Sequence, residues 1–162
     1  MTKVGFISLG CSKNLVDTEV MLRTLYDAGF EITPDETEAE IIVINTRGFI
    51  ESAKQESIEN ILDAAKLKEW GKCKHIVVTG CLAERYRDEV MREMPEVDAI
   101  IGVGSLEDIT EACKTVLRGE KYSSFKDKET SKLGGERILT TADHTAYLKI
   151  AEGCDNRCSY CA

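Results

Sequence analysis

Short apolar runs that alternate with amphipathic stretches constrain the fold of this chain most. Four runs rich in β-branched residues are separated by segments in which apolar residues recur every three or four positions. The runs cover residues 3–9, 41–44, 75–78 and 99–103, and the helical segments cover about 14–28, 50–65, 82–94 and 105–117. Continuous apolar strands with helices between them are typical of a parallel sheet that is covered on both faces. The pattern therefore predicts an α/β domain over residues 1–119.

The pattern changes after residue 119. Residues 120–143 are mostly polar and contain the pair Gly134 and Gly135, which is typical of a linker. Residues 146–151 are again apolar enough to predict a strand, and a cysteine-rich segment follows them. A strand and a loop cannot build a core alone. We therefore expect residues 144–162 to begin a second, truncated domain of a longer protein.

Composition excludes several classes of protein. Hydrophobic residues make up 43% of the 162 positions and only two are proline, which argues against a disordered or collagen-like chain. The longest apolar run, residues 41–44, has four residues, whereas a membrane-spanning helix needs about 20. The first residues lack the apolar core of a signal peptide, so we expect no membrane association and a cytoplasmic location. The net charge of -8 gives no support to nucleic-acid binding by this segment.

Three closely spaced cysteines give the strongest chemical signal. Cys154, Cys158 and Cys161 follow the last predicted strand with the spacing C-x3-C-x2-C. Three such thiolates can ligate three irons of a [4Fe–4S] cluster and leave the fourth iron open to a substrate or cofactor. Zinc is an alternative, although structural zinc sites normally have four protein ligands. A site without any metal is the remaining possibility.

A second set of residues follows the strands of the first domain. Cys11 lies just beyond the first strand, Cys81 just beyond the third, and Arg47 beyond the strand between them. The carboxyl ends of parallel strands meet at one edge of the sheet, so the pattern predicts a site built from three loops. The alternative is two isolated thiols beside glycine turns. The remaining cysteines and the histidines are predicted to be core, structural or surface residues: Cys73, Cys113, His75 and His144.

Motifs along the whole chain resemble those of the radical S-adenosylmethionine (SAM) methylthiotransferases. Residues 8–14 (SLGCSKN) are similar to the first motif of that family, 44–50 (INTRGFI) to the second and 78–83 (VTGCLA) to the third. The triad of Cys154, Cys158 and Cys161 resembles the radical-SAM signature, and it follows in the family's order. The sequence of residues 8–14 is similar to that of the RimO type of the family.

This resemblance implies a fold and a set of cofactors. It implies a three-layer, flavodoxin-like first domain that holds one [4Fe–4S] cluster through three cysteines, followed by a radical-SAM barrel. In that barrel Cys154, Cys158 and Cys161 would hold a second [4Fe–4S] cluster, whose open iron binds SAM. An electron donor of the flavodoxin or ferredoxin type would reduce this cluster, and SAM would be cleaved to a 5′-deoxyadenosyl radical.

The resemblance also implies a reaction. RimO-type enzymes attach a methylthio group to the β-carbon of an aspartate in small-subunit ribosomal protein twelve. The related tRNA adenosine methylthiotransferases (MiaB type) are one alternative, and a non-catalytic metal-binding or interaction module is another. We expect these 162 residues to be inactive alone, because SAM binding and shielding of the radical need the rest of the barrel.

One position departs from the family pattern. Arg47 stands where the second motif has a cysteine, so only Cys11 and Cys81 remain of the expected ligands. Arginine has no thiolate and stays protonated at any relevant pH. Cys73 and Cys113 are poorly placed to replace the missing ligand. The sequence therefore predicts a weak or absent cluster in the first domain.

Overall fold

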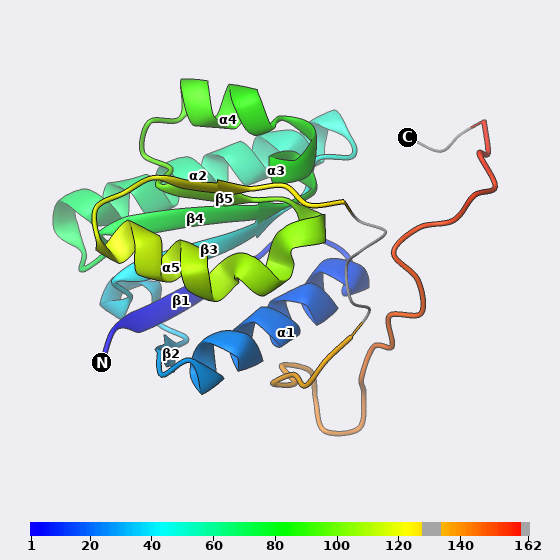
Figure 1. The fold of residues 1–162 in the computed structure, drawn as a ribbon, viewed down its shortest axis with the longest axis horizontal. Coiled ribbons are helices and arrows are strands. Elements are labelled where there is room, and N and C mark those ends of the chain that lie inside the picture. The colour runs from blue at the N-terminus through cyan, green and yellow to red at the C-terminus, as the bar shows by residue number, and fades with distance from the viewer. Residues whose placement is uncertain (128–133, 160–162) are drawn as a thin grey trace.

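A six-stranded parallel sheet forms the centre of the protein, as Figure 1 shows. The computed structural model describes residues 1–127 and 134–159. The strands lie in the order β2-β1-β3-β4-β5-β6, and every neighbouring pair is parallel. Their bounds are β1 Lys3–Ser8, β2 Glu31–Thr33, β3 Ile41–Thr46, β4 His75–Gly80, β5 Ala99–Ile101 and β6 Tyr122–Ser124. The α/β class predicted from the sequence is confirmed.

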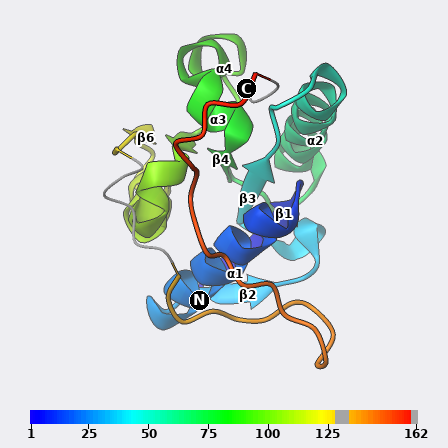
Figure 2. The ribbon, with the colours of Figure 1, turned by 90° about the vertical axis from the view of Figure 1, so that its right-hand side faces the viewer.

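Helices cover both faces of this sheet and make a three-layer domain (Figures 1 and 2). One face packs against α2, α3 and α4, and the other packs against α1 and α5. Alternate residues of β3 supply both cores, with Ile42 and Ile44 on the first face and Ile41 and Val43 on the second. The helices are α1 Ser12–Asp27, α2 Glu51–Trp70, α3 Cys81–Arg85, α4 Arg87–Glu93 and α5 Ile109–Leu117, with short 3-10 turns at Glu36–Glu38 and Val103–Asp108.

Four features differ from the sequence-based expectation. The edge strands β2 and β6 were not predicted, and β6 lies in the segment that was expected to be a linker. The single helix expected over residues 82–94 is divided into α3 and α4 at Tyr86, whose φ of -121° and ψ of 29° are not helical. Residues 146–151 form no strand, because no strand in the described part of the chain lies beside them to pair with their backbone.

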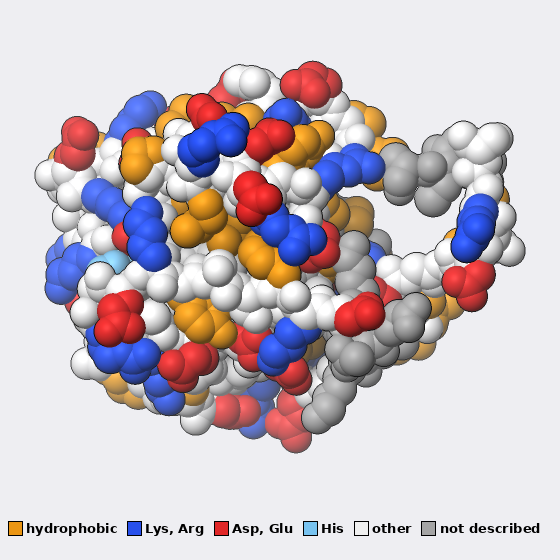
Figure 3. Space-filling view, turned by 45° about the horizontal axis from the view of Figure 1, so that its top comes forward, with side chains coloured by type: hydrophobic (Ala, Val, Ile, Leu, Met, Phe, Trp, Pro, Cys, Tyr) orange, Lys and Arg blue, Asp and Glu red, His pale blue; other side chains and the backbone are white. Residues whose placement is uncertain are grey.

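The C-terminal segment, residues 134–159, crosses the outside of α1 and then runs toward the carboxyl edge of the sheet, near α3 (Figure 2). It contains no helix or strand. On the face drawn in Figure 3, basic and acidic side chains are interspersed rather than gathered by sign. Among the residues that the structure describes, no helix has the length and apolar character needed to cross a membrane.

Candidate functional site

Three loops converge at the carboxyl edge of the sheet. Ser8 of β1 pairs with Asn45 of β3, and Asn45 pairs in turn with Thr79 of β4, so these strands end level with one another. The loops that follow bring Cys11, Arg47 and Cys81 to the wall of one pocket of about 510 Å³. The two thiols are therefore not isolated at separate turns. They share a cavity with a guanidinium group.

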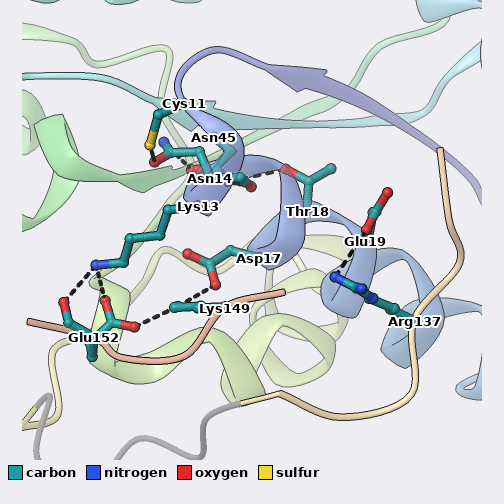
Figure 4. A network of polar contacts seen from close by, with 10 residues as sticks. All are labelled: Cys11, Lys13, Asn14, Asp17, Thr18, Glu19, Asn45, Arg137, Lys149 and Glu152. Atoms are coloured by element: carbon teal, nitrogen blue, oxygen red, sulfur yellow. Dashed lines mark hydrogen bonds and ion pairs between the residues drawn. The ribbon is translucent and has the colours of Figure 1, made fainter. Parts of the chain in front are cut away.

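A buried amide network fixes the first two loops against each other (Figure 4). Asn14, in the first turn of α1, donates through Nδ2 to the carbonyls of Leu9 and Thr46 and to Oδ1 of Asn45. Asn45 is 1% exposed and donates back to the Asn14 carbonyl at 2.8 Å and to Oγ1 of Thr18 at 3.0 Å. The Cys11 thiol lies within 3.5 Å of Oδ1 of Asn14. The network thus connects Cys11 to the end of β3.

Two glycines allow the third loop to approach. Gly80 ends β4 with φ of +93°, and a Cβ there would collide with the Thr46 carbonyl oxygen. Gly48 lies against the start of α3, where a Cβ would come within 2.9 Å of the Leu82 backbone. Side chains at either position would push the Cys81 turn away from the Arg47 loop.

Arg47 is held in the pocket by α2. Its backbone N–H donates to Oγ of Ser57 at 2.9 Å, and the same hydroxyl donates to the Arg47 carbonyl at 2.8 Å. Its guanidinium lies 3.3 Å from the Glu56 carboxylate, with the side chain 39% exposed. Ser57 is fully buried. This position therefore adds a cation, paired with Glu56, to the wall of the pocket that also contains the two thiols.

This donor set does not fit a cluster held by three cysteines. The pocket offers the Cys11 and Cys81 thiols and a guanidinium, which cannot donate electrons to iron. Among the described residues, no group of three or more His, Cys, Asp or Glu side chains is placed to hold a metal. The expected cluster of the first domain thus lacks one of its three ligands.

The other predicted residues lie apart from this pocket. Cys154 is exposed and Cys158 is half-buried, while Cys161 lies outside the described residues. Cys113 is fully buried in the core between the sheet and α5, as predicted, and burial raises the pKa of its thiol to about 12. Cys73 is also buried, which raises its pKa, and its thiol donates to the His75 carbonyl.

The two histidines are not part of the pocket. His75, at the start of β4, is half-buried, and this burial lowers its pKa. His144 is exposed in the C-terminal segment.

Comparison with known proteins places the domain in a family. Residues 3–102 match the family model described as "Uncharacterized protein family UPF0004". The chain belongs to this family. The UPF0004 match includes all three loops of the pocket, with Cys11, Arg47 and Cys81, and ends before the segment that carries Cys154.

Curated relatives are similar to essentially the whole chain, and not only to residues 3–102. It is 52% identical, over its full length, to the "Ribosomal protein uS12 methylthiotransferase RimO" of Caldicellulosiruptor saccharolyticus. It is 53% identical over 98% of its length to the protein of the same name from Lachnoclostridium phytofermentans. The chain spans 37% and 36% of the length of these two relatives, and it matches their N-terminal part.

Proposed function

We propose that this chain is the N-terminal part of a ribosomal protein uS12 methylthiotransferase. The observation that carries the proposal is the similarity, at about half of all positions and over essentially the whole chain, to relatives that bear this name. The convergence of the three motif loops on one pocket supports it independently. Because the chain spans little more than a third of those relatives, the activity belongs to the whole protein, and the 162 residues alone are expected to be inactive.

In this proposal, the whole protein adds a methylthio group to the β-carbon of an aspartate in uS12. Cys154, Cys158 and Cys161 would hold a [4Fe–4S] cluster that binds SAM. When bound, this cluster supplies reductive cleavage of SAM, with electrons from a flavodoxin- or ferredoxin-type donor. The cytoplasm, where ribosomal proteins are made, is the proposed location.

The first-domain pocket adds a second candidate function. Its two thiols and Arg47 do not complete the set of three cysteines expected for the sulfur-donating cluster of the family. A protein with this pocket could cleave SAM without transferring sulfur. Arg47 and its pairing with Glu56 are the observations that favour this candidate. No comparable observation favours the tRNA-modifying reaction.

Mass spectrometry of both substrates separates these functions. The full-length protein that contains this chain is reconstituted with iron and sulfide without oxygen, then supplied with SAM, a reductant, and either uS12 or tRNA. An added methylthio mass on an aspartate of uS12 is the expected result. A modified tRNA would overturn the choice of substrate, and 5′-deoxyadenosine without any methylthio product would establish the second candidate. A Cys158→Ala variant is the matched control, because it should abolish SAM cleavage.

A further inference from the structure

The C-terminal segment is attached to α1 through buried carboxylates. Glu19, in the second turn of α1, has a side chain that is 2% exposed. Its Oε1 accepts hydrogen bonds from the Thr140 backbone N–H at 2.8 Å and from the Thr140 hydroxyl at 3.0 Å. Arg137 approaches its other oxygen at 3.5 Å. This first attachment fixes the segment where it meets α1.

A second attachment has Lys149 at its centre (Figure 4). The Lys149 ammonium lies 2.6 Å from Oδ1 of Asp17 and 2.5 Å from Oε2 of Glu152, and its side chain is only 8% exposed. Burial alone would lower the pKa of Lys149, but the hydrogen bonds to both carboxylates raise it instead. Lys149 therefore stays charged, and it joins α1 to the segment that leads to Cys154.

The ion-pair chain continues back to α1. Oε1 of Glu152 lies 2.5 Å from the Lys13 ammonium, which also donates to the Glu152 carbonyl at 2.8 Å. Lys13 stands two residues after Cys11, and Glu152 stands two residues before Cys154. Lys13 and Glu152 both line a second pocket of about 350 Å³, which adjoins the first one at Cys81. The ion pair between Lys13 and Glu152 thus lies beside the turn that carries Cys81.

Apolar burial does not explain the position of this part of the segment. Leu148 and Ile150, on either side of Lys149, are 82% and 83% exposed, while the lysine between them is buried. These two apolar side chains therefore make little contact with the rest of the described residues. Removal of one partner of a buried ion pair is costly, because it leaves the other charge buried without its counter-charge. The ion pairs of Lys149 and Glu152 with α1 therefore hold this part of the segment in place.

We infer that Asp17, Lys149, Glu152 and Lys13 form a clamp that fixes the stretch leading to Cys154 beside the turn that carries Cys81. The purpose of the clamp rests on the proposed function, since it would place the SAM-binding cysteines beside the first-domain site. Its members are positioning residues, because they act through the loops that they hold. The position of the Cys154 loop relative to the first domain can be measured without an assay of enzymatic activity.

Pulsed electron paramagnetic resonance measures that position directly. One spin label is attached to Cys154 and the other to a cysteine introduced at Glu59, which is exposed on α2. Cys11, Cys81, Cys158 and Cys161 are changed to serine, whereas Cys73 and Cys113 are buried and stay. We expect one narrow distance distribution in this background at neutral pH. Lys149→Met should broaden it several-fold, and Lys149→Arg should keep it narrow.

A matched control removes an equally short ion pair away from the clamp. Lys68 of α2 lies 2.5 Å from Asp98, with both side chains about a fifth exposed. Lys68→Met should leave the distribution narrow, which shows that the loss of an ion pair alone does not release the segment. A distribution that is equally narrow with Lys149→Met, or broad in the background protein, would overturn the clamp. A narrow distribution in the labelled protein, together with no modification of uS12 by the unlabelled full-length protein with its cysteines intact, would overturn the proposed function and leave the clamp intact.

Discussion

Thr46 of β3 lies directly opposite Gly80 of β4 in the parallel ladder, so Arg47 and Cys81, the residues that follow them, leave the sheet at the same level. This register makes position 47 part of the pocket wall that contains Cys81. A cysteine at position 47 would have its Cβ at the same place in that wall. The identity of this one residue therefore decides whether the pocket has two thiols or three.

The first prediction is that Arg47→Cys restores iron binding to the first domain. The experiment uses the chain with Cys154, Cys158 and Cys161 changed to alanine, so that only the pocket contributes. After anaerobic reconstitution we expect little bound iron or sulfide in this parent, and about four irons per chain in the Arg47→Cys variant. Iron and sulfide analysis with the absorption spectrum measures both.

Arg47→Ala is the control for this experiment. It removes the guanidinium and its pairing with Glu56 but adds no thiol. We expect it to bind as little iron as the parent. If the alanine variant bound as much iron as an iron-loaded cysteine variant, the positive charge of Arg47, and not a missing ligand, would be what prevents cluster assembly.

The second prediction concerns the amide network. Asn14→Ala leaves the Leu9 and Thr46 carbonyls and the Asn45 amide oxygen without their donor. Buried polar groups that lose a partner cost about 1–3 kcal/mol. We expect the free energy of unfolding in urea to fall by that amount. Asn60→Ala on α2, which removes an exposed hydrogen bond to the Glu56 carbonyl, should change it by less than about 0.5 kcal/mol.

The third prediction concerns the close approach of two loops. In Gly48→Ala, the new Cβ would lie 2.9 Å from the Leu82 backbone, so the Cys81 turn must shift. Overpacking of this kind typically costs about 1–3 kcal/mol. Gly153→Ala is the matched control, because nothing lies within 4 Å of a Cβ at that position. Similar unfolding midpoints for the two variants would contradict the predicted contact.

The sequence predicts the strands and helices that have a periodic apolar pattern. Short apolar runs rich in β-branched residues identify β1, β3 and β4, and the helical stripe that contains Cys113 identifies α5 and its buried side. Strands of three residues at the sheet edges carry no periodic signal, which explains why β2 and β6 were missed. The division of a predicted helix at Tyr86 depends on backbone angles that no apolar pattern encodes.

The site was predictable in outline only. Parallel topology brings Cys11, Arg47 and Cys81 to one edge, and the structure places all three around one pocket. The pairing of Asn14 with Asn45 joins polar residues 31 positions apart, and their occurrence inside two of the motifs was the available signal. Residues 146–151 predicted a strand, whereas the structure buries Lys149 and exposes its apolar neighbours. Local pattern cannot anticipate charges that lie more than a hundred residues apart in sequence.

The fourth prediction separates the thiols by reactivity. Thiolates react with iodoacetamide, and a pKa of about 12 leaves roughly one Cys113 in ten thousand ionised at pH 8. Exposed Cys11, Cys81 and Cys154 should be alkylated at least a hundredfold faster than Cys113, as measured by peptide mass spectrometry. In denaturant all cysteines should react at similar rates. Rapid alkylation of Cys113 in the folded protein would show that α5 does not cover it.

The last prediction is that acid releases the clamp through Glu152. Burial of this carboxyl acts to raise its pKa, but hydrogen bonds from Lys13 and Lys149 lower it below the usual 4.5. The attached state therefore prefers the ionised carboxylate. Its contribution is complete well above that value and is lost as the pH falls through the lowered pKa.

The ionisation of two neighbouring groups, Lys149 and Asp17, also affects the clamp. Lys149, whose pKa is raised, contributes below its usual 10.5 and loses its contribution only in strong alkali. Burial raises the pKa of Asp17, whereas its hydrogen bond to Lys149 lowers it, so the attachment itself favours the ionised Asp17 carboxylate. A comparison of the parent with Glu152→Gln isolates the Glu152 effect. The spin-label distribution should broaden in the parent as the pH falls below about 4.5. It should change much less in Glu152→Gln, which is broader from the start. Identical pH profiles, with far-UV circular dichroism unchanged in both, would show that Glu152 does not hold the segment.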